Sequence, residues 1–118
     1  MIAIAAILFA ATPVQQVPGL TADQEAEIVV TAQKARSMRW SYDLDKVGGV
    51  RKCKVTRTSG DAEIDQLGCE ATRECAAKGF RKSAQMAACI RPRWREKVRA
   101  LAMARGDEKA RRANDAED

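Results

Sequence analysis

Apolar and polar side chains alternate in the middle of the chain, over residues 39–45. The apolar positions are Trp40, Tyr42 and Leu44, and the residues between them are polar. This period of two is typical of a strand with one buried face. Gly48 and Gly49 can take a positive φ at little cost, and residues 50–57 alternate in the same way. The pattern therefore predicts a β-hairpin with one core face and one wet face.

Beyond the hairpin, the apolar residues recur at helical spacing. Ser59 and Asp61 can cap the start of a helix, and Gly79 can end it in the left-handed conformation. The apolar stripe between them consists of Ile64, Leu67, Ala71 and Cys75. A second helix is expected over residues 82–90. A third is expected to begin at Pro92, which fits a first turn because it has no amide to satisfy. The stripe of this third helix is Trp94, Val98, Leu101 and Ala102.

The fold class that these elements predict is α+β. A β-hairpin packs on a disulfide-linked helix, and two further helices follow. This disulfide-stapled domain is expected to occupy residues 39–105. With 118 residues and few aromatic side chains, there is room for one domain with a thin core.

The N-terminal flank opens with an apolar run. Residues 2–11 carry no charge and are far fewer than the roughly 20 that span a bilayer as a helix. The run is typical of the core of a signal peptide, with cleavage near residues 10–12 or at Gly19. We assign residues 1–19 to a signal peptide and linker. The alternative is a buried first helix of a cytosolic protein.

The segments on either side of the domain are less regular. Residues 20–38 are expected to be extended, with a short strand at 27–33 because β-branched side chains gather there. Residues 106–118 are charged and poor in apolar side chains, which predicts a disordered tail.

The four cysteines support export. An even number in a short exported chain indicates two disulfides, for which three connectivities are possible. A zinc site is the alternative, but the chain has no Cys-x-x-Cys and no histidine. The predicted strand and helix bring Cys53 within reach of Cys69, which favours this pair and leaves Cys75 for Cys89. The predicted location is periplasmic or secreted.

The net charge of +5 is concentrated near the C-terminus. Residues 80–114 contain eleven basic and three acidic side chains, a net charge of +8. This stretch supplies the candidate partner-binding residues Arg91, Arg93, Trp94, Arg95 and Arg99. Arginine with tryptophan suits an anionic membrane surface or polymer, and nucleic acid is a less favoured partner. The alternative is the solvated face of a structural helix.

No constellation of catalytic side chains stands out in the sequence. Without histidine, a serine or cysteine nucleophile lacks its usual base, and the carboxylates are spread over helix positions. No glycine-rich phosphate loop precedes a helix. We therefore expect an interaction role and not an enzymatic one, with no catalytic residues, cofactor or bound metal.

Residues 39–69 resemble the first half of a TonB C-terminal domain. The shared features are an opening strand, a glycine-centred turn, a strand at residues 50–57, and Thr58-Ser59-Gly60 followed by Ile64-Asp65. Some members of that family carry a cysteine pair at the separation of Cys53 and Cys69. After Cys69 the sequences diverge, because the Phe-x-Pro-Ala run and the further strand of the family have no counterpart here.

This resemblance implies a periplasmic location, a core of hairpin and helix, and binding of a partner by strand addition along the hairpin. The transmembrane anchor and proline-rich spacer of a TonB protein are not found, so we expect no energy transduction. Residues 27–34 are also similar to the short segment by which TonB-dependent receptors bind TonB proteins. The candidate partner-binding residues in this segment are Glu27, Ile28, Val29, Val30 and Thr31.

The function expected from the sequence is that of a small periplasmic, TonB-like module that binds another envelope protein without catalysis. The alternative is a cationic envelope-associated protein that binds anionic lipid or polymer through its C-terminal basic helix.

Overall fold

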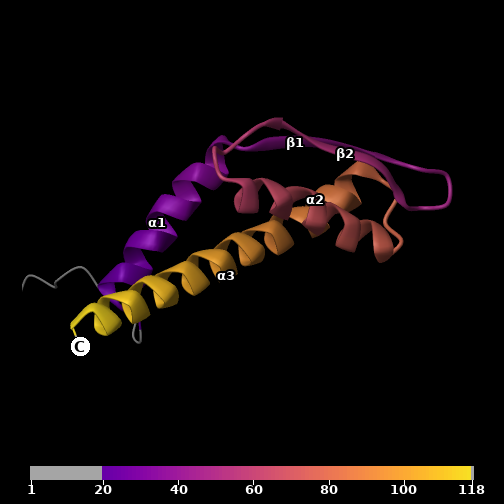
Figure 1. Ribbon diagram of the computed structural model, residues 1–118. Coiled ribbons are helices and arrows are strands. Elements are labelled where there is room, and N and C mark those ends of the chain that lie inside the picture. The colour runs from indigo at the N-terminus through magenta and orange to yellow at the C-terminus, as the bar shows by residue number, and fades with distance from the viewer. Residues whose placement is uncertain (1–19, 118) are drawn as a thin grey trace, which may run out of the picture.

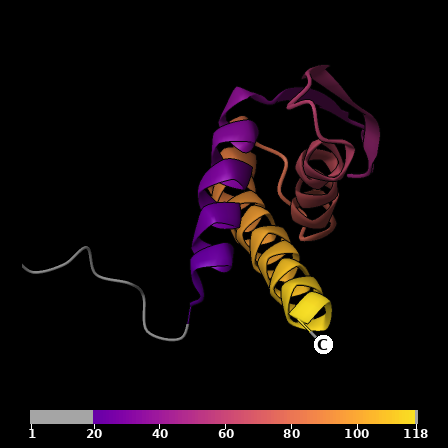
Figure 2. The same cartoon turned by 60° about the vertical axis from the view of Figure 1, so that its left-hand side comes forward.

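The computed structural model describes residues 20–117. Its elements are, in order, α1 (Ala22–Ser37), β1 (Arg39–Leu44), β2 (Val50–Arg57), α2 (Ala62–Ala77) and α3 (Ser83–Glu117). The hairpin of β1 and β2 lies over α2, and α1 runs beside the C-terminal half of α3 (Figure 1 and Figure 2). The predicted α+β class, with a hairpin packed on a disulfide-linked helix, is confirmed. The predicted signal peptide lies outside the described residues.

The predicted hairpin forms, but the predicted alternation of burial holds only for β1; along β2 only Val50 and Cys53 are partly buried, and Val55 is exposed. β1 and β2 pair antiparallel, with Tyr42 opposite Cys53 and Trp40 opposite Val55. Burial alternates residue by residue along β1, whose apolar side chains pack on residues of α2 and α3. Gly48 in the connecting turn has a φ of 95°, a conformation that residues with a Cβ rarely adopt.

A polar side chain caps the start of α2, and a glycine follows its end. The Asp61 side chain accepts hydrogen bonds from two amides of the first turn, so Asp61 is the N-cap. Ser59, the other predicted capping residue, instead donates its hydroxyl to Asp65 at 2.6 Å. Gly79 follows the helix with a φ of 91°, which is the predicted left-handed conformation.

In place of the two helices expected after α2, the chain forms one continuous helix, α3, with Pro92 inside it. Proline removes one backbone hydrogen bond, to the carbonyl of Ala88 four residues earlier. Both residues are exposed, so water can satisfy that carbonyl. Packing holds the helix on both sides of this point, because Met86 and Ile90 before the proline belong to one buried cluster and Val98 after it belongs to another.

The prediction of a disordered tail at residues 106–118 is wrong, because α3 continues to Glu117. Gly106 lies close against α1: a Cβ at this position would be 2.6 Å from the Cα of Gln24. The residues that follow are mostly good helix formers, and Arg112 pairs with Glu108 one turn earlier at 2.6 Å. A low apolar content does not prevent a helix that is already nucleated from extending.

The prediction of an extended segment at residues 20–38, with a strand at 27–33, is also wrong. Thr21 and Gln24 form a capping box at the start of α1, in which each side chain bonds to the backbone amide of the other. Acidic residues lie in the first turn and basic residues in the last, which suits the helix dipole. Thr31 and Ala35 are buried on the face that packs antiparallel against α3. Capping and packing together outweigh the strand propensity of the β-branched run.

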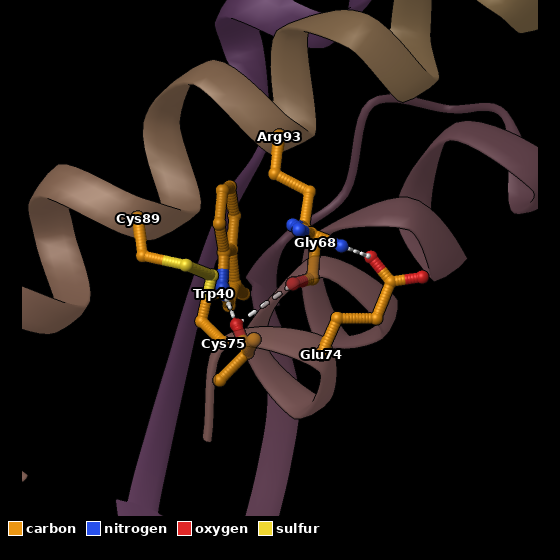
Figure 3. Close-up of a disulfide and its surroundings, with 7 residues drawn as sticks. Trp40, Gly68, Glu74, Cys75, Cys89 and Arg93 are labelled. Atoms are coloured by element: carbon orange, nitrogen blue, oxygen red, sulfur yellow. Dashed lines mark hydrogen bonds and ion pairs between the residues drawn. A yellow bond between two sulfur atoms is a disulfide. The ribbon is translucent and has the colours of Figure 1, made fainter. Parts of the chain in front are cut away.

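Trp40 lies where the hairpin, α2 and α3 meet (Figure 3). Its Nε1 donates a hydrogen bond to the Thr72 hydroxyl at 3.0 Å, and its ring centre lies 5.4 Å from that of Trp94. The Trp40 ring can lie this close to α2 because residue 68 is a glycine: a Cβ on Gly68 would lie 2.7 Å from the ring. The indole is therefore both packed and hydrogen-bonded.

Both disulfides link separate elements, and the favoured pairing is confirmed. Cys53–Cys69 joins β2 to α2, and Cys75–Cys89 joins α2 to α3. Cys75 is completely buried in the main apolar cluster, beside Met86, whereas Cys53 is partly exposed. The second disulfide therefore belongs to the core and the first to its margin.

We expect the two disulfides to stabilise the fold unequally. Their loops span 16 and 14 residues, so each removes about 3 kcal/mol of chain entropy from the unfolded state. The variant C75A/C89A also leaves a gap in the core and should lose about 1–2 kcal/mol more than C53A/C69A. Urea unfolding followed by circular dichroism measures both losses. Equal losses, or a larger loss in C53A/C69A, would contradict this assignment.

Candidate functional site

The first group of candidate partner-binding residues forms the middle of α1. Its members are Glu27, Ile28, Val29, Val30 and Thr31. Thr31 is buried toward α3, whereas Val29 and Val30 are exposed. The segment is helical and offers no free strand, so the expected strand addition through it is not supported by its conformation. A role of the exposed valines in partner binding stays a prediction.

The second group, on α3, is divided between structure and surface. Arg93 pairs with Glu74 of α2 at 3.1 Å, and Trp94 packs against Trp40. These two candidates therefore help to hold the helices together. The exposed members of the group are Arg91, Arg95 and Arg99. They lie one turn apart, and none of them has an ion pair within residues 20–117.

The backbone edge of β1 is free on the side away from β2. Within the described part of the chain, the sheet consists of β1 and β2 alone. At such an edge, every second residue directs its amide and carbonyl away from the paired strand. No hydrogen bond within residues 20–117 reaches the backbone of residues 40–44 except from β2. β1 therefore presents a row of unpaired backbone groups.

A groove runs along this free edge, between β1 and the first turns of α3. Met86 and Ile90, which are buried, give it an apolar base, and the part near Arg91 encloses about 230 Å³. No residue of β2 lines it, which places it on the unpaired side of β1. We call it the β1 groove. Its lining consists of residues 39–44, Arg81, Ser83, Met86, Ala87, Ile90 and Arg91.

Three arginines make the β1 groove positively charged. Arg39 and Arg91 line one part of it and Arg81 lines the other. Arg81 reaches the hairpin turn, where it donates a hydrogen bond to the carbonyl of Val47 at 3.4 Å. None of the three arginines has a carboxylate partner within the described residues. The single acidic residue of the lining, Asp43, already faces an arginine of β2 at 3.7 Å.

A second hollow lies between the end of α2 and α3, beside Phe80, Cys89 and Pro92. It is bounded mainly by helices, whose backbone groups are paired within each helix except the carbonyl of Ala88, which Pro92 leaves without its amide partner. Apart from this one carbonyl, it offers a ligand only side-chain contacts. The β1 groove, by contrast, combines an apolar base, positive charge and free backbone, and we take it as the candidate site.

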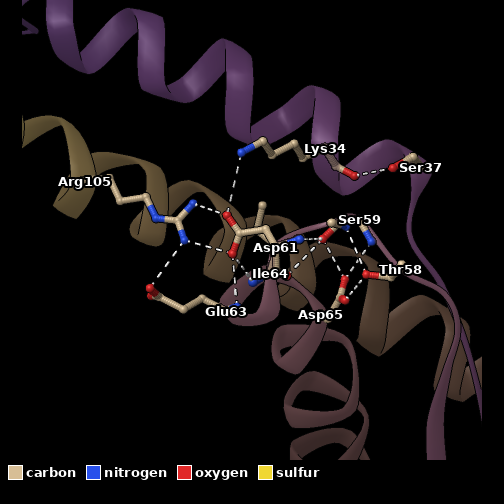
Figure 4. A network of polar contacts seen from close by, with 10 residues as sticks. Lys34, Ser37, Thr58, Ser59, Asp61, Glu63, Ile64, Asp65 and Arg105 are labelled. Atoms are coloured by element: carbon tan, nitrogen blue, oxygen red, sulfur yellow. Dashed lines mark hydrogen bonds and ion pairs between the residues drawn. The ribbon is translucent and has the colours of Figure 1, made fainter.

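A polar network at the N-terminal end of α2 fixes α1 and α3 in place (Figure 4). Arg105 of α3 donates two hydrogen bonds to the Asp61 carboxylate, at 2.7 and 3.0 Å, and Lys34 of α1 lies 4.0 Å from it. The hydrogen bond from Arg105 lowers the pKa of Asp61 to about 2, from an ordinary value of 3.8. The groups of this network satisfy one another, which indicates a structural role.

Sequence reasoning located β1 but not its groove. The alternation at residues 39–45 identified the strand, whereas Met86 and Ile90 were assigned only to a short helix. The available signal was their spacing: positions 86, 90 and 94 follow one another at four-residue intervals and therefore share one face of a continuous helix. Pro92 obscures this signal, because a proline also suits the first turn of a new helix.

The comparisons with known proteins add no assignment. No family model matches the chain, and no curated protein or solved structure matches it. Within residues 20–117, no cluster of cysteine and carboxylate side chains is arranged to hold a metal ion. None of the described helices is both long and apolar enough to cross a membrane. Among the described features, the geometry of the β1 groove is the one that bears on function.

We expect Arg105→Ala to destabilise the fold in a pH-dependent way. The pKa of Asp61 is about 2 when folded against an ordinary 3.8, so its ionised form contributes stability that is present above about pH 4. This contribution is lost as the pH falls through the folded value. The variant should lose about 1–2 kcal/mol at neutral pH and much less near pH 2.

Urea unfolding at the two pH values measures this difference. Arg99→Ala, an exposed arginine on the same helix, is the matched control and should have little effect at either pH. A loss in Arg105→Ala that is the same at both pH values would show that the pair with Asp61 does not carry the effect.

Proposed function

We propose that this protein is a small, non-catalytic protein-binding module of the bacterial envelope that receives an extended segment of a partner along β1. The observation that carries the proposal is the free backbone edge of β1 beside a groove with an apolar base. A segment that adds to such an edge gains main-chain hydrogen bonds whatever its side chains are. The side chains of the groove then determine which segment is preferred.

The position of the helices leaves room for an added strand. α2 packs beneath both strands, whereas α3 meets β1 through the packing of Trp94 on Trp40 and through the side chains that line the groove. A third strand would lie about 4.8 Å from β1, on the α3 side. One of its faces would contact Tyr42, Ala87 and Ile90, and the other would face solvent. Alternate residues of the bound segment should therefore be apolar.

Charge defines the partner more closely. Arg39, Arg81 and Arg91 line the groove without carboxylate partners among the described residues. An acidic segment would neutralise them and would be attracted from a distance by the positive field. The proposed ligand is thus an extended segment in which apolar and acidic residues alternate.

The disulfides support the proposed location. Two disulfides are typical of an oxidising compartment outside the cytoplasm. Together with the apolar run at residues 2–11, they support a periplasmic protein. The TonB-like role that we propose is limited to binding and includes no energy transduction.

A fluorescein-labelled ten-residue peptide of alternating valine and glutamate tests this proposal. Fluorescence anisotropy should show binding that largely persists at about 0.5 M salt, because main-chain pairing is not screened. Only every second amide of an added strand faces β1. Two N-methylated peptides test this, one methylated at the odd-numbered amides and the other at the even-numbered amides. The peptide whose methyl groups point toward β1 should not bind, and the other should still bind.

Variants of the protein test the role of charge. Arg91→Glu should weaken binding about tenfold, and Arg95→Glu, outside the groove, is the control.

Equal binding of the two N-methylated peptides would exclude strand addition. Binding that disappears by about 0.3–0.5 M salt, and that Arg91→Glu and Arg95→Glu weaken equally, would favour the alternative function. In that case Arg91, Arg95 and Arg99 would form a cationic surface for anionic lipid or polymer. Cosedimentation with vesicles of anionic and of neutral lipid would then measure that binding.

A further inference from the structure

α1 has an apolar outer face that no other described element covers. Val29 and Val30 are 54% and 43% exposed, whereas most other large apolar side chains of residues 20–117 are buried or partly buried. Ala26 and Gln33 are exposed one turn before and after them and continue the same face. The opposite face packs on α3. We call these four residues the α1 outer face.

The charges that border the α1 outer face differ between its two ends. Asp23 and Glu25 lie in the first turn of α1, and Lys34 and Arg36 lie in the last turn. Eleven positions, or about three helical turns, separate Asp23 from Lys34 and also Glu25 from Arg36. Each acidic residue therefore shares a flank of the face with one basic residue. Each flank is acidic at one end and basic at the other.

We propose that the α1 outer face binds the same face of a second copy of this chain, with the two helices antiparallel. A two-fold axis that passes near Val29 and Val30 makes the surface complementary to itself. Glu25 of each copy then faces Arg36 of the other on one flank, and Asp23 faces Lys34 on the other flank. A parallel pair would bring like charges together. The order of charges along α1 thus favours a second copy of the chain as the partner and an antiparallel direction for its helix.

The contact is small, so the dimer is weak and reversible. A helix of 16 residues is about 24 Å long, and two such helices bury less than the roughly 1,200 Å² of the smallest standard interfaces. The monomer does not need the contact to fold, because α1 already packs on α3 through Thr31 and Ala35. The dimer uses no residue of the β1 groove and is independent of the function proposed for that groove.

A charge exchange between copies tests both the contact and its direction. Glu25 and Arg36 suit this purpose, since neither has an ion pair within residues 20–117, whereas Lys34 lies 4.0 Å from Asp61. In Glu25→Arg alone, the Glu25–Arg36 flank would bring arginines of the two copies together at both of its ends, and in Arg36→Glu alone it would bring glutamates together. A mixture of these two variants would restore opposite charges on the Glu25–Arg36 flank in a heterodimer.

The measurement is sedimentation equilibrium of the full chain with both disulfides formed, at concentrations up to about 500 µM. We expect a monomer–dimer equilibrium in the unchanged protein, a dissociation constant raised about tenfold or more in either single variant, and recovery in their equimolar mixture. Val29→Lys should abolish the dimer. Val47→Lys, at the 89% exposed tip of the hairpin, is the matched control and should leave it unchanged.

Three outcomes would overturn the proposal. The first is a monomer at every concentration. The second is the same dissociation constant for Val29→Lys and Val47→Lys. The third is a mixture of Glu25→Arg and Arg36→Glu that associates no better than either variant alone. Circular dichroism spectra that match the unchanged protein would show that each variant is folded, so that loss of the dimer reports on the contact.

Discussion

The fold depends on the contact that Trp40 makes with the two helices beneath the hairpin. Its indole donates to the Thr72 hydroxyl, which in turn donates to the Gly68 carbonyl at 2.8 Å, so the polar atom buried with the ring is satisfied. The ring also packs against Trp94 of α3, in the space that the missing Cβ of Gly68 leaves open. This contact holds β1 by the side chains of its inner face. The backbone edge of β1 takes no part in it and stays available.

Local signals predicted the parts of the fold in which a single pattern dominates. The alternation from Trp40 to Leu44 and the turn at Gly48 were enough for the hairpin, and the strand and helix geometry favoured the observed disulfides. The two long helices were not predicted correctly, because their stability is not local. α1 contains a β-branched run that is helical only in its capped, packed context, and the end of α3 is polar but follows a helix that α1 already supports at Gly106.

The candidate site was predicted only in part, because it too depends on elements that are distant in the sequence. An edge strand can be identified from its own residues, but a groove requires the position of a second element. Here that element is the first part of α3, which the disulfide between Cys75 and Cys89 ties to α2 on the unpaired side of β1. The arginines of α3 were correctly identified as the basic stretch. Their division between ion pairs within the fold and exposed positions depends on where Glu74 lies in α2.

The two outer edges of the hairpin differ in a way that favours β1 as the acceptor of an added strand. A free edge invites unwanted pairing, and lysine on an edge strand is a common protection against it. β2 carries Arg51, Lys52, Lys54 and Arg57 among its eight residues and includes no acidic side chain. β1 carries one basic residue, at its start, and presents Ser41 and Asp43 along its exposed face. Charge therefore discourages pairing at β2, while β1 itself carries few charges and lies beside a groove with an apolar base. Selective protection of one edge is what a module needs if it is to receive one strand without forming an open-ended sheet.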